Sequence, residues 1–330
     1  AATSGAVNIA LGLCVMGAGV VTGNDNIALG QKAMLALTSG KCNIALGINA
    51  LGASTTGCNN IAIGLNTMSG AVVTGIDNTA IGQKSGEALT SGNYNVSLGI
   101  FSLRSSTTGC YNVAIGANAM ETGVTTGIKN VAIGQGANCK LTTGCNNVGI
   151  GPNALGASTT GCFNIALGST ALGGAITTGI NNIALGTNAM DALTSGIDNV
   201  AIGQDAYGAA TTGCENIAIG KTAMGAGVTT GYDNTAIGRK AADALTTGQY
   251  NVAMGKDALG ASTTGCFNIA IGAVALGAGV TTGTDNVAIG QNASTKVTSG
   301  SYNVALGQDA LCTLTTSSDN VAVGRLTLAK

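Results

Sequence analysis

Hydrophobic and polar residues follow one five-residue pattern along the whole chain, Asn, then Ile, Val or Thr, then a small residue, an aliphatic residue and Gly. The pattern begins at Asn8 and occurs nineteen times, and the sequence steps between its asparagines recur in the order 18, 17, 17. Three patterns therefore make a larger repeat of 52 residues. Self-similarity at a short, fixed period is typical of a solenoid. Between the first motif and the last, at Asn320, the motif asparagines are Asn26, Asn43, Asn60, Asn78, Asn95, Asn112, Asn130, Asn147, Asn164, Asn182, Asn199, Asn216, Asn234, Asn251, Asn268, Asn286 and Asn303.

Alternation with a period of two inside the motif predicts a short β-strand. We expect the residue after Asn and the aliphatic residue two places further on to face the core. The residue between them is Ala except at Ser97 and Gly149, so it is expected to form a flat outer face. The Gly that ends the motif predicts a bend. The Leu or Met that usually follows four residues later, as in Met16 and Leu51, predicts a second short strand or extended edge and a third core side chain.

Most coils close with Thr-Thr-Gly or Thr-Ser-Gly, and Ser317 is the one replacement of this Gly. This composition predicts a turn in which Gly supplies a positive φ and the hydroxyl groups bond to nearby backbone. Stacked coils would align the motif asparagines into a ladder, in which each side-chain carbonyl accepts from the amide of the next coil. Such a ladder would fix the register of the strands.

The length of one coil follows from packing. A coil of 52 residues would have three sides of roughly 50 Å, which two or three aliphatic side chains per side could not fill. The sequence therefore predicts an all-β fold, a parallel β-solenoid (β-roll) of nineteen coils of 17–18 residues. We interpret residues 1–330 as a single domain that is uncapped at both ends.

Composition narrows the functional classes. Charged residues make up 8% of the chain, aromatic residues 3%, and the net charge is −1 without a basic cluster, so we expect no nucleic-acid partner. No apolar run reaches the length of a membrane span. The chain has no His, its carboxylates are scattered, and no Gly-Lys-Ser/Thr phosphate loop occurs. We expect no catalytic residues, no metal site and no cofactor.

Cysteines follow the repeat. Cys58, Cys110, Cys162, Cys214 and Cys266 are 52 residues apart, and without His or a Cys-x-x-Cys motif they give little support to a zinc site. Cys145 occupies the same place one coil before Cys162, so these two are a candidate disulfide. Calcium is a weaker candidate ligand, because Asp25, Asp77, Asp233 and Asp285 each supply one carboxylate to a Thr-Gly-x-Asp-Asn segment.

The segment Asn-Val-Ala-Ile-Gly, as at Asn112–Gly116 and Asn286–Gly290, resembles the repeat of the head domains of trimeric autotransporter adhesins. The segment Thr-Thr-Gly-x-x-Asn-x-Ala-Ile-Gly is similar to repeats in phage tail fibres and other surface proteins. The resemblance is at the level of the repeat, and it implies a parallel β-roll, exposure outside a cell or on a virion, and an adhesive or scaffolding role. The coils here are longer than those of the adhesin heads, and no binding residue is transferred.

The chain starts and stops inside a coil, and the two half-coils together make one whole. We therefore expect copies to stack head to tail into an extracellular filament. The predicted assembly interface comprises Ala1, Thr3, Ser4, Val7, Asn8, Ile9, Leu11, Asn320, Val321, Val323, Leu326, Leu328 and Lys330.

Two alternatives stay open. The first is the shaft of an adhesin or phage tail fibre with a surface glycan or receptor as partner, for which an intermittent row of aromatic residues before the motif Asn could provide contacts. The second is ice binding, because Thr or Ser precedes the turn Gly throughout and the chain carries little charge.

Overall fold

A computed structural model describes residues 4–17, 19–123, 125–279 and 281–329. The chain divides into two compact units, Ala1–Phe163 and Asn164–Lys330, here called unit 1 and unit 2 and each described by itself. The interpretation of 1–330 as a single domain stays a prediction.

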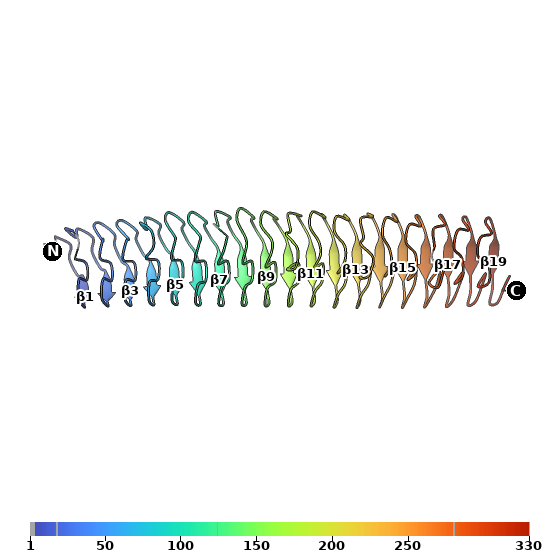
Figure 1. Ribbon diagram of the computed structural model, residues 1–330, viewed down its shortest axis with the longest axis horizontal. Helices are drawn as coiled ribbons and strands as arrows, with labels where there is room; N and C mark the ends of the chain where they lie inside the picture. The colour runs from blue at the N-terminus through green and yellow to red at the C-terminus, as the bar shows by residue number, and fades with distance from the viewer. Residues whose placement is uncertain (1–3, 18, 124, 280, 330) are drawn as a thin grey trace. The chain divides into compact units, whose positions relative to one another are not determined.

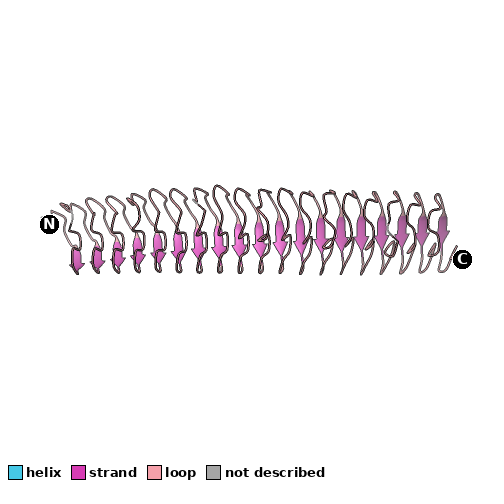
Figure 2. Cartoon of the chain, in the orientation of Figure 1, coloured by secondary structure: helices cyan, strands magenta, loops and turns pink. Residues whose placement is uncertain are grey.

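Each unit consists of three-residue strands joined by turns, and the described residues contain no helix (Figures 1 and 2). The strands of unit 1 are β1 (Ile9–Leu11), β2 (Ile27–Leu29), β3 (Ile44–Leu46), β4 (Ile61–Ile63), β5 (Thr79–Ile81), β6 (Val96–Leu98), β7 (Val113–Ile115), β8 (Val131–Ile133) and β9 (Val148–Ile150). Those of unit 2 are β10 (Ile165–Leu167), β11 (Ile183–Leu185), β12 (Val200–Ile202), β13 (Ile217–Ile219), β14 (Thr235–Ile237), β15 (Val252–Met254), β16 (Ile269–Ile271), β17 (Val287–Ile289), β18 (Val304–Leu306) and β19 (Val321–Val323).

Successive strands within each unit pair in parallel and in register. Ile27 of β2 lies opposite Ile44 of β3, and Ile183 of β11 lies opposite Val200 of β12, so equivalent motif positions stack. Each partner is one motif away in sequence, which confirms the parallel β-solenoid and the predicted length of its coils. The wider coil, with three motifs in each circuit, is excluded because strands one motif apart are direct neighbours.

The predicted orientation of the strands is wrong. In β4 the side chain of Ala62 is fully buried, whereas Ile61 and Ile63 on either side of it are half-buried. The small residue faces the interior in the other described strands as well, except in β1, where it is exposed. The reason is parity, because alternate residues of a strand share a face. The motif Asn60 points inward, so the residue two places on must point inward too and the branched residues must point outward.

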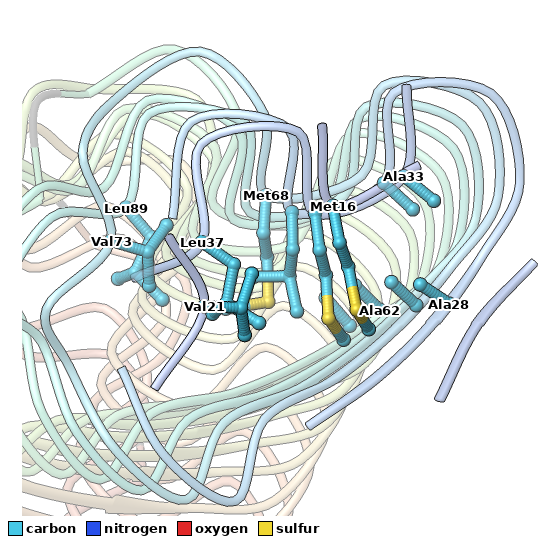
Figure 3. Packing of buried hydrophobic residues seen from close by; sticks show 14 residues of the cluster. Met16, Val21, Ala28, Ala33, Leu37, Ala62, Met68, Val73 and Leu89 are labelled. Atoms are coloured by element: carbon cyan, nitrogen blue, oxygen red, sulfur yellow. The ribbon is translucent and has the colours of Figure 1, made fainter. Parts of the chain in front are cut away.

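The core consists of small strand residues facing long unbranched or γ-branched side chains. Figure 3 shows Met16 and Met68 pointing toward Ala28 and Ala62 of the strands. The prediction that the Leu or Met four residues after the motif Gly fills the core is wrong at Leu328, which is 56% exposed. It is confirmed at the other thirteen positions, where the residue is buried: Met16, Met34, Leu51, Met68, Leu103, Met120, Leu155, Leu172, Met190, Met224, Leu259, Leu276 and Leu311. The predicted second strand is absent at these positions. Leu51 has a φ of 50° and Asn49 a φ of 58°, so this side of the coil is a series of turns with left-handed residues.

The Gly that ends the motif and the Gly that closes the coil are each required for a different structural reason. The motif Gly47 has a φ of 135°, as the predicted bend requires. Gly40, which closes a coil, does not have the predicted positive φ. A Cβ at Gly40 would lie 2.4 Å from the carbonyl oxygen of Gly57 on the next coil, so close approach of the two backbones requires Gly here. The positive φ falls two residues later, on Cys42, at 56°.

Candidate functional site

The motif asparagines form a buried ladder of hydrogen bonds within each unit. Asn43 donates from its backbone N and from Nδ2 to Oδ1 of Asn26, both at 3.0 Å, and from Nδ2 to the carbonyl oxygen of Gly57 at 2.7 Å. The motif asparagines named above from Asn26 to Asn303 are at most 2% exposed. Each amide therefore joins one coil to the next and also holds the turn that closes its own coil.

Tyr207 is a contact of this ladder that the sequence analysis missed. It takes the place of the usual Leu or Met in its coil, is fully buried, and accepts a hydrogen bond from Nδ2 of Asn216 at 2.6 Å. Burial raises the pKa of the Tyr207 hydroxyl far above its ordinary value of 10. Ala210 lies where several other coils carry Leu, Ser, Thr or Val, so the ring has room. A large residue paired with an unusually small one in the same coil is the signal that could have identified it.

We expect Tyr207→Phe to lower the free energy of unfolding by about 1 kcal/mol at pH 7, because it removes one buried hydrogen bond while Asn216 keeps the carbonyl oxygen of Gly231 as an acceptor. The folded-state pKa of Tyr207 is raised, so its contribution is fully present below pH 10 and is lost as the pH rises further. Urea unfolding at pH 7 and pH 11 should show a loss of stability at high pH that is smaller in Tyr207→Phe. An equal loss in both proteins would contradict this assignment.

Two exceptions in the motif are explained by local packing in unit 1. Ser97 replaces Ala, and its Oγ lies 2.6 Å from Oγ of Ser85, which also contacts Oγ of Ser102 at 3.0 Å. Gly149 replaces Ala because a Cβ there would lie 2.1 Å from Oδ1 of the buried Asn138. These buried polar groups pack against each other across neighbouring coils.

A row of charges crosses consecutive coils of unit 1. Arg104 donates from Nε to Glu87 at 3.1 Å and from Nη1 to Glu121 at 3.3 Å, and Lys84 lies 3.5 Å from Glu87. The guanidinium also lies over the ring of Phe101, 5.0 Å from its centre. The group borders an open hollow of about 520 Å³. The Arg104 side chain is 39% exposed, so these ion pairs contribute modestly, at most about 1 kcal/mol each.

The structure brings Cys145 and Cys162 together in unit 1, with their Sγ atoms 2.8 Å apart, and both are free thiols. The backbone N of Cys145 donates to Sγ of Cys162 at 3.1 Å, and partial burial raises the pKa of the Cys162 thiol. Cys58 and Cys110 likewise accept from the backbone N of Lys41 and Asn93 on the preceding coils. Cys58, Cys110 and Cys162 are thus acceptors that bridge neighbouring coils, and the disulfide stays a prediction.

Aromatic residues stack on one another at the surface. The rings of Tyr94 and Tyr111 lie 4.9 Å apart in unit 1, and those of Tyr250 and Phe267 lie 4.8 Å apart in unit 2, each pair within 12° of parallel. Stacking within each pair covers one face of each ring, and the four side chains stay exposed. The glycan or receptor partner stays a prediction.

The predicted calcium ligands lie apart. Asp25 and Asp77 in unit 1, and Asp233 and Asp285 in unit 2, are each three coils from the next member of their pair and lie just before the motif Asn. Beside Asp233, Glu215 has a raised pKa because it shares a hydrogen bond with that carboxylate. Among the residues that the structure describes, no three His, Cys, Asp or Glu side chains gather as a metal site would require. The expectation of no cofactor stays a prediction.

The residues of the predicted assembly interface lie at β1 in unit 1 and at β19 in unit 2. Ala1, Thr3 and Lys330 fall outside the described residues. Four strand residues of the interface are exposed: Ile9 at 55%, Leu11 at 70%, Val321 at 66% and Val323 at 65%. Ser4, Val7, Leu326 and Leu328 are also exposed, whereas Asn8 and Asn320 are half-buried. The interface residues from Ser4 to Leu11 belong to the first described coil, and those from Asn320 to Leu328 belong to the last.

Within the described ranges there is no helix with the length and apolar character of a membrane span. Comparison with protein-family models and with curated proteins gives no match to this chain.

Proposed function

We propose that this chain is a structural subunit of an extracellular filament or fibre and that copies add end to end through their solenoid coils. The proposal rests on the hydrogen bonds that the repeated polar side chains make between coils. The motif asparagines and many of the turn threonines bond to the next coil, as Asn43 does to Asn26 and as Thr38 Oγ1 does to the carbonyl oxygen of Thr55 at 3.0 Å. The repeated polar side chains therefore serve to join one coil to the next.

The exposed edges of the strands support growth in this direction. Among the described residues β1 pairs with β2 and β19 pairs with β18, which leaves one edge of each strand open. Open strand edges are templates for pairing with another chain. Asn320 donates to Oδ1 of Asn303 from its backbone N and from Nδ2, and an added coil would extend this ladder.

Ser317 opposes such growth. It replaces the Gly that closes a coil, and on the preceding coil a Cβ at the equivalent Gly300 would lie 2.2 Å from the carbonyl oxygen of Ser317. By the same geometry, the Cβ of Ser317 occupies the place where the carbonyl oxygen of an added coil would lie. End-to-end stacking is therefore expected to be slow or to need a local shift at this residue.

Ser317→Gly provides the test. We expect electron microscopy of the purified 330-residue chain to show longer filaments for Ser317→Gly than for the unmodified chain, with a repeat near 4.8 Å along the axis. The matched control is Ser318→Gly, which changes the adjacent serine and should leave filament length unchanged. Discrete particles with no filaments for both the unmodified chain and Ser317→Gly, at every concentration tested, would overturn the proposal.

Ice binding receives less support from the same geometry. Some of the threonine hydroxyls directly before the turn Gly already donate to the next coil, as Thr178 Oγ1 does to the carbonyl oxygen of Thr194 at 3.4 Å. The flat face of the strands carries aliphatic side chains, with Thr only at Thr79 and Thr235.

A further inference from the structure

The outward side chains of the strands form two aliphatic rows in each unit. We call the first and third residues of the strands of a unit its aliphatic stripe, with the strands β1–β9 in unit 1 and β10–β19 in unit 2. All of these residues are Ile, Val, Leu or Met except Thr79 and Thr235, and none is charged. In unit 2 they include Ile165 at 41% and Leu167 at 47% exposed, and the remaining members are exposed or half-buried.

The area of this surface is unusual for a protein in isolation. Full burial of an aliphatic side chain contributes about 2.5 kcal/mol, which corresponds to about 100 Å² of apolar surface. A side chain that is about one-third exposed therefore leaves ~30 Å² of apolar surface in water. The stripe of unit 2 therefore exposes roughly 600 Å², at the upper end of the largest apolar patch on a typical monomer. Two such surfaces packed together would bury roughly 1,200 Å² in total, which is the lower limit of a standard protein interface. Unit 1 adds a stripe of similar size.

The sequence contains none of the devices that keep an exposed sheet apart from other sheets. Natural sheets place Lys, Glu or Pro at exposed edges to prevent association, and a large apolar patch without such residues marks an interaction site. No charged residue or Pro occurs at any stripe position over all nineteen strands, although the chain carries 27 charged side chains elsewhere. Absence of charge over so many equivalent positions indicates a surface that is covered in the assembled protein.

We propose that a second copy of this chain covers the aliphatic stripe, face to face, in a two-fold pair. The stripe repeats at strand spacing on every coil, so a partner that fits it along its length must carry rows of side chains at the same spacing, and this chain has them. Two flat sheets pack face to face about 10 Å apart with their side chains interdigitated. The two rows of each stripe form ridges, and the space between the rows is the groove that receives a ridge of the partner.

A lipid surface fits the stripe less well. Proteins that lie on membranes combine an apolar face with Lys and Arg beside it. Here the net charge is −1, and the positions next to the stripe on the strand side are the motif Asn and Gly.

The test is the mass of the chain in solution, measured by analytical ultracentrifugation over a range of concentrations. One copy has a mass of 31.7 kDa, and at concentrations below those at which filaments form we expect the unmodified chain to sediment with twice this mass. Replacing two stripe residues in unit 2, Ile217→Lys with Ile269→Lys, should raise the dissociation constant of the pair at least about 100-fold, because each buried ammonium would lack a partner. Thr247→Lys with Thr264→Lys adds the same charge at exposed positions outside the stripe and should leave the pair intact.

A milder variant covers the case in which the lysines prevent folding. Ile217→Thr with Ile269→Thr introduces the residue that the repeat already carries at Thr79 and Thr235, so we expect it to fold with an unchanged circular dichroism spectrum and to pair more weakly than the unmodified chain. A single-copy mass for the unmodified chain at all concentrations would overturn the proposal. So would a mass that responds equally to the stripe and the control variants, or an assembly of three or more copies that the stripe variants leave intact.

Pairing across the stripe is independent of end-to-end growth, and the outcomes distinguish the two. If end-to-end stacking fails, the chain still forms discrete pairs that the stripe variants dissociate. If the pair fails, filaments of Ser317→Gly still form and appear as single rather than doubled rods, with the same width in the stripe variants.

Discussion

Asn199→Asp is expected to lower the free energy of unfolding by about 3–5 kcal/mol at pH 7, although it changes only one amide nitrogen to oxygen. Asn199 Nδ2 donates to Oδ1 of Asn182 at 3.0 Å and to the carbonyl oxygen of Gly213 at 2.8 Å. The substitution places a buried carboxylate oxygen against two acceptors. Its bond from the backbone N of Asn216 to Oδ1, at 3.0 Å, can persist. Denaturant unfolding followed by circular dichroism measures the effect.

The pH dependence provides a second readout of this variant. The introduced carboxyl group is buried among acceptors, which raises its pKa above the value of about 3.9 in the unfolded chain. The stability loss relative to the unmodified protein should therefore be small below pH 4 and grow as the pH rises toward 7. Gln204→Glu, an amide-to-acid change at an exposed position, is the control and should alter stability by less than about 0.5 kcal/mol. A loss of that small size for Asn199→Asp would contradict the ladder.

The second large effect is expected for Ala184→Leu, which should lower the free energy of unfolding by about 3 kcal/mol. Ala184 is the middle residue of β11 and is fully buried opposite the wall that carries Met190 and Leu193, both also fully buried. The interior of a coil has no space for three additional carbon atoms. Thermal unfolding should show a lower midpoint for this variant, and Ala184→Ser, which adds one atom, should show a smaller decrease. Equal midpoints for Ala184→Leu and the unmodified protein would mean that this side chain does not face the core.

Coil length and the burial of Leu and Met could be predicted from the sequence because both depend on spacing alone. The regular spacing of the motif asparagines sets the length of a coil whichever way the strand faces. Leu or Met recurs four residues after the motif Gly, as at Leu51, and its burial does not depend on the orientation of the strand. The amide ladder could also be deduced, since a recurring Asn has few other ways to satisfy its side chain.

The orientation of the strand was predicted wrongly because hydrophobicity was used to decide what is inside. Ile61 and Ile63 are the most apolar residues of their motif, and they face outward. The information needed was present, since Asn60 and Ile61 are adjacent and cannot both point inward from one strand. A buried Asn fixes the small residue two places later as its companion in the core.

The candidate surfaces were hidden by the same mistake. With Ile and Val assigned to the core, the sequence predicts no exposed apolar face, so the aliphatic stripe is a feature that the structure adds. The bond from Asn216 to Tyr207 depends on how a ring crosses the coil, which spacing does not determine. The requirement for Gly at position 40 likewise comes from a backbone approach between coils and not from local turn geometry.

The most direct test of the inward Asn and small residue is a comparison of the free energies of unfolding of Ala184→Leu and Ile183→Ala, neighbours in β11, at a protein concentration low enough to keep copies apart. The structure predicts a loss of about 3 kcal/mol for Ala184→Leu and of less than about 1 kcal/mol for Ile183→Ala, whose side chain is half-buried on the outer face. The reverse order, with Ile183→Ala losing about 2–5 kcal/mol and Ala184→Leu nearly unchanged, would contradict it.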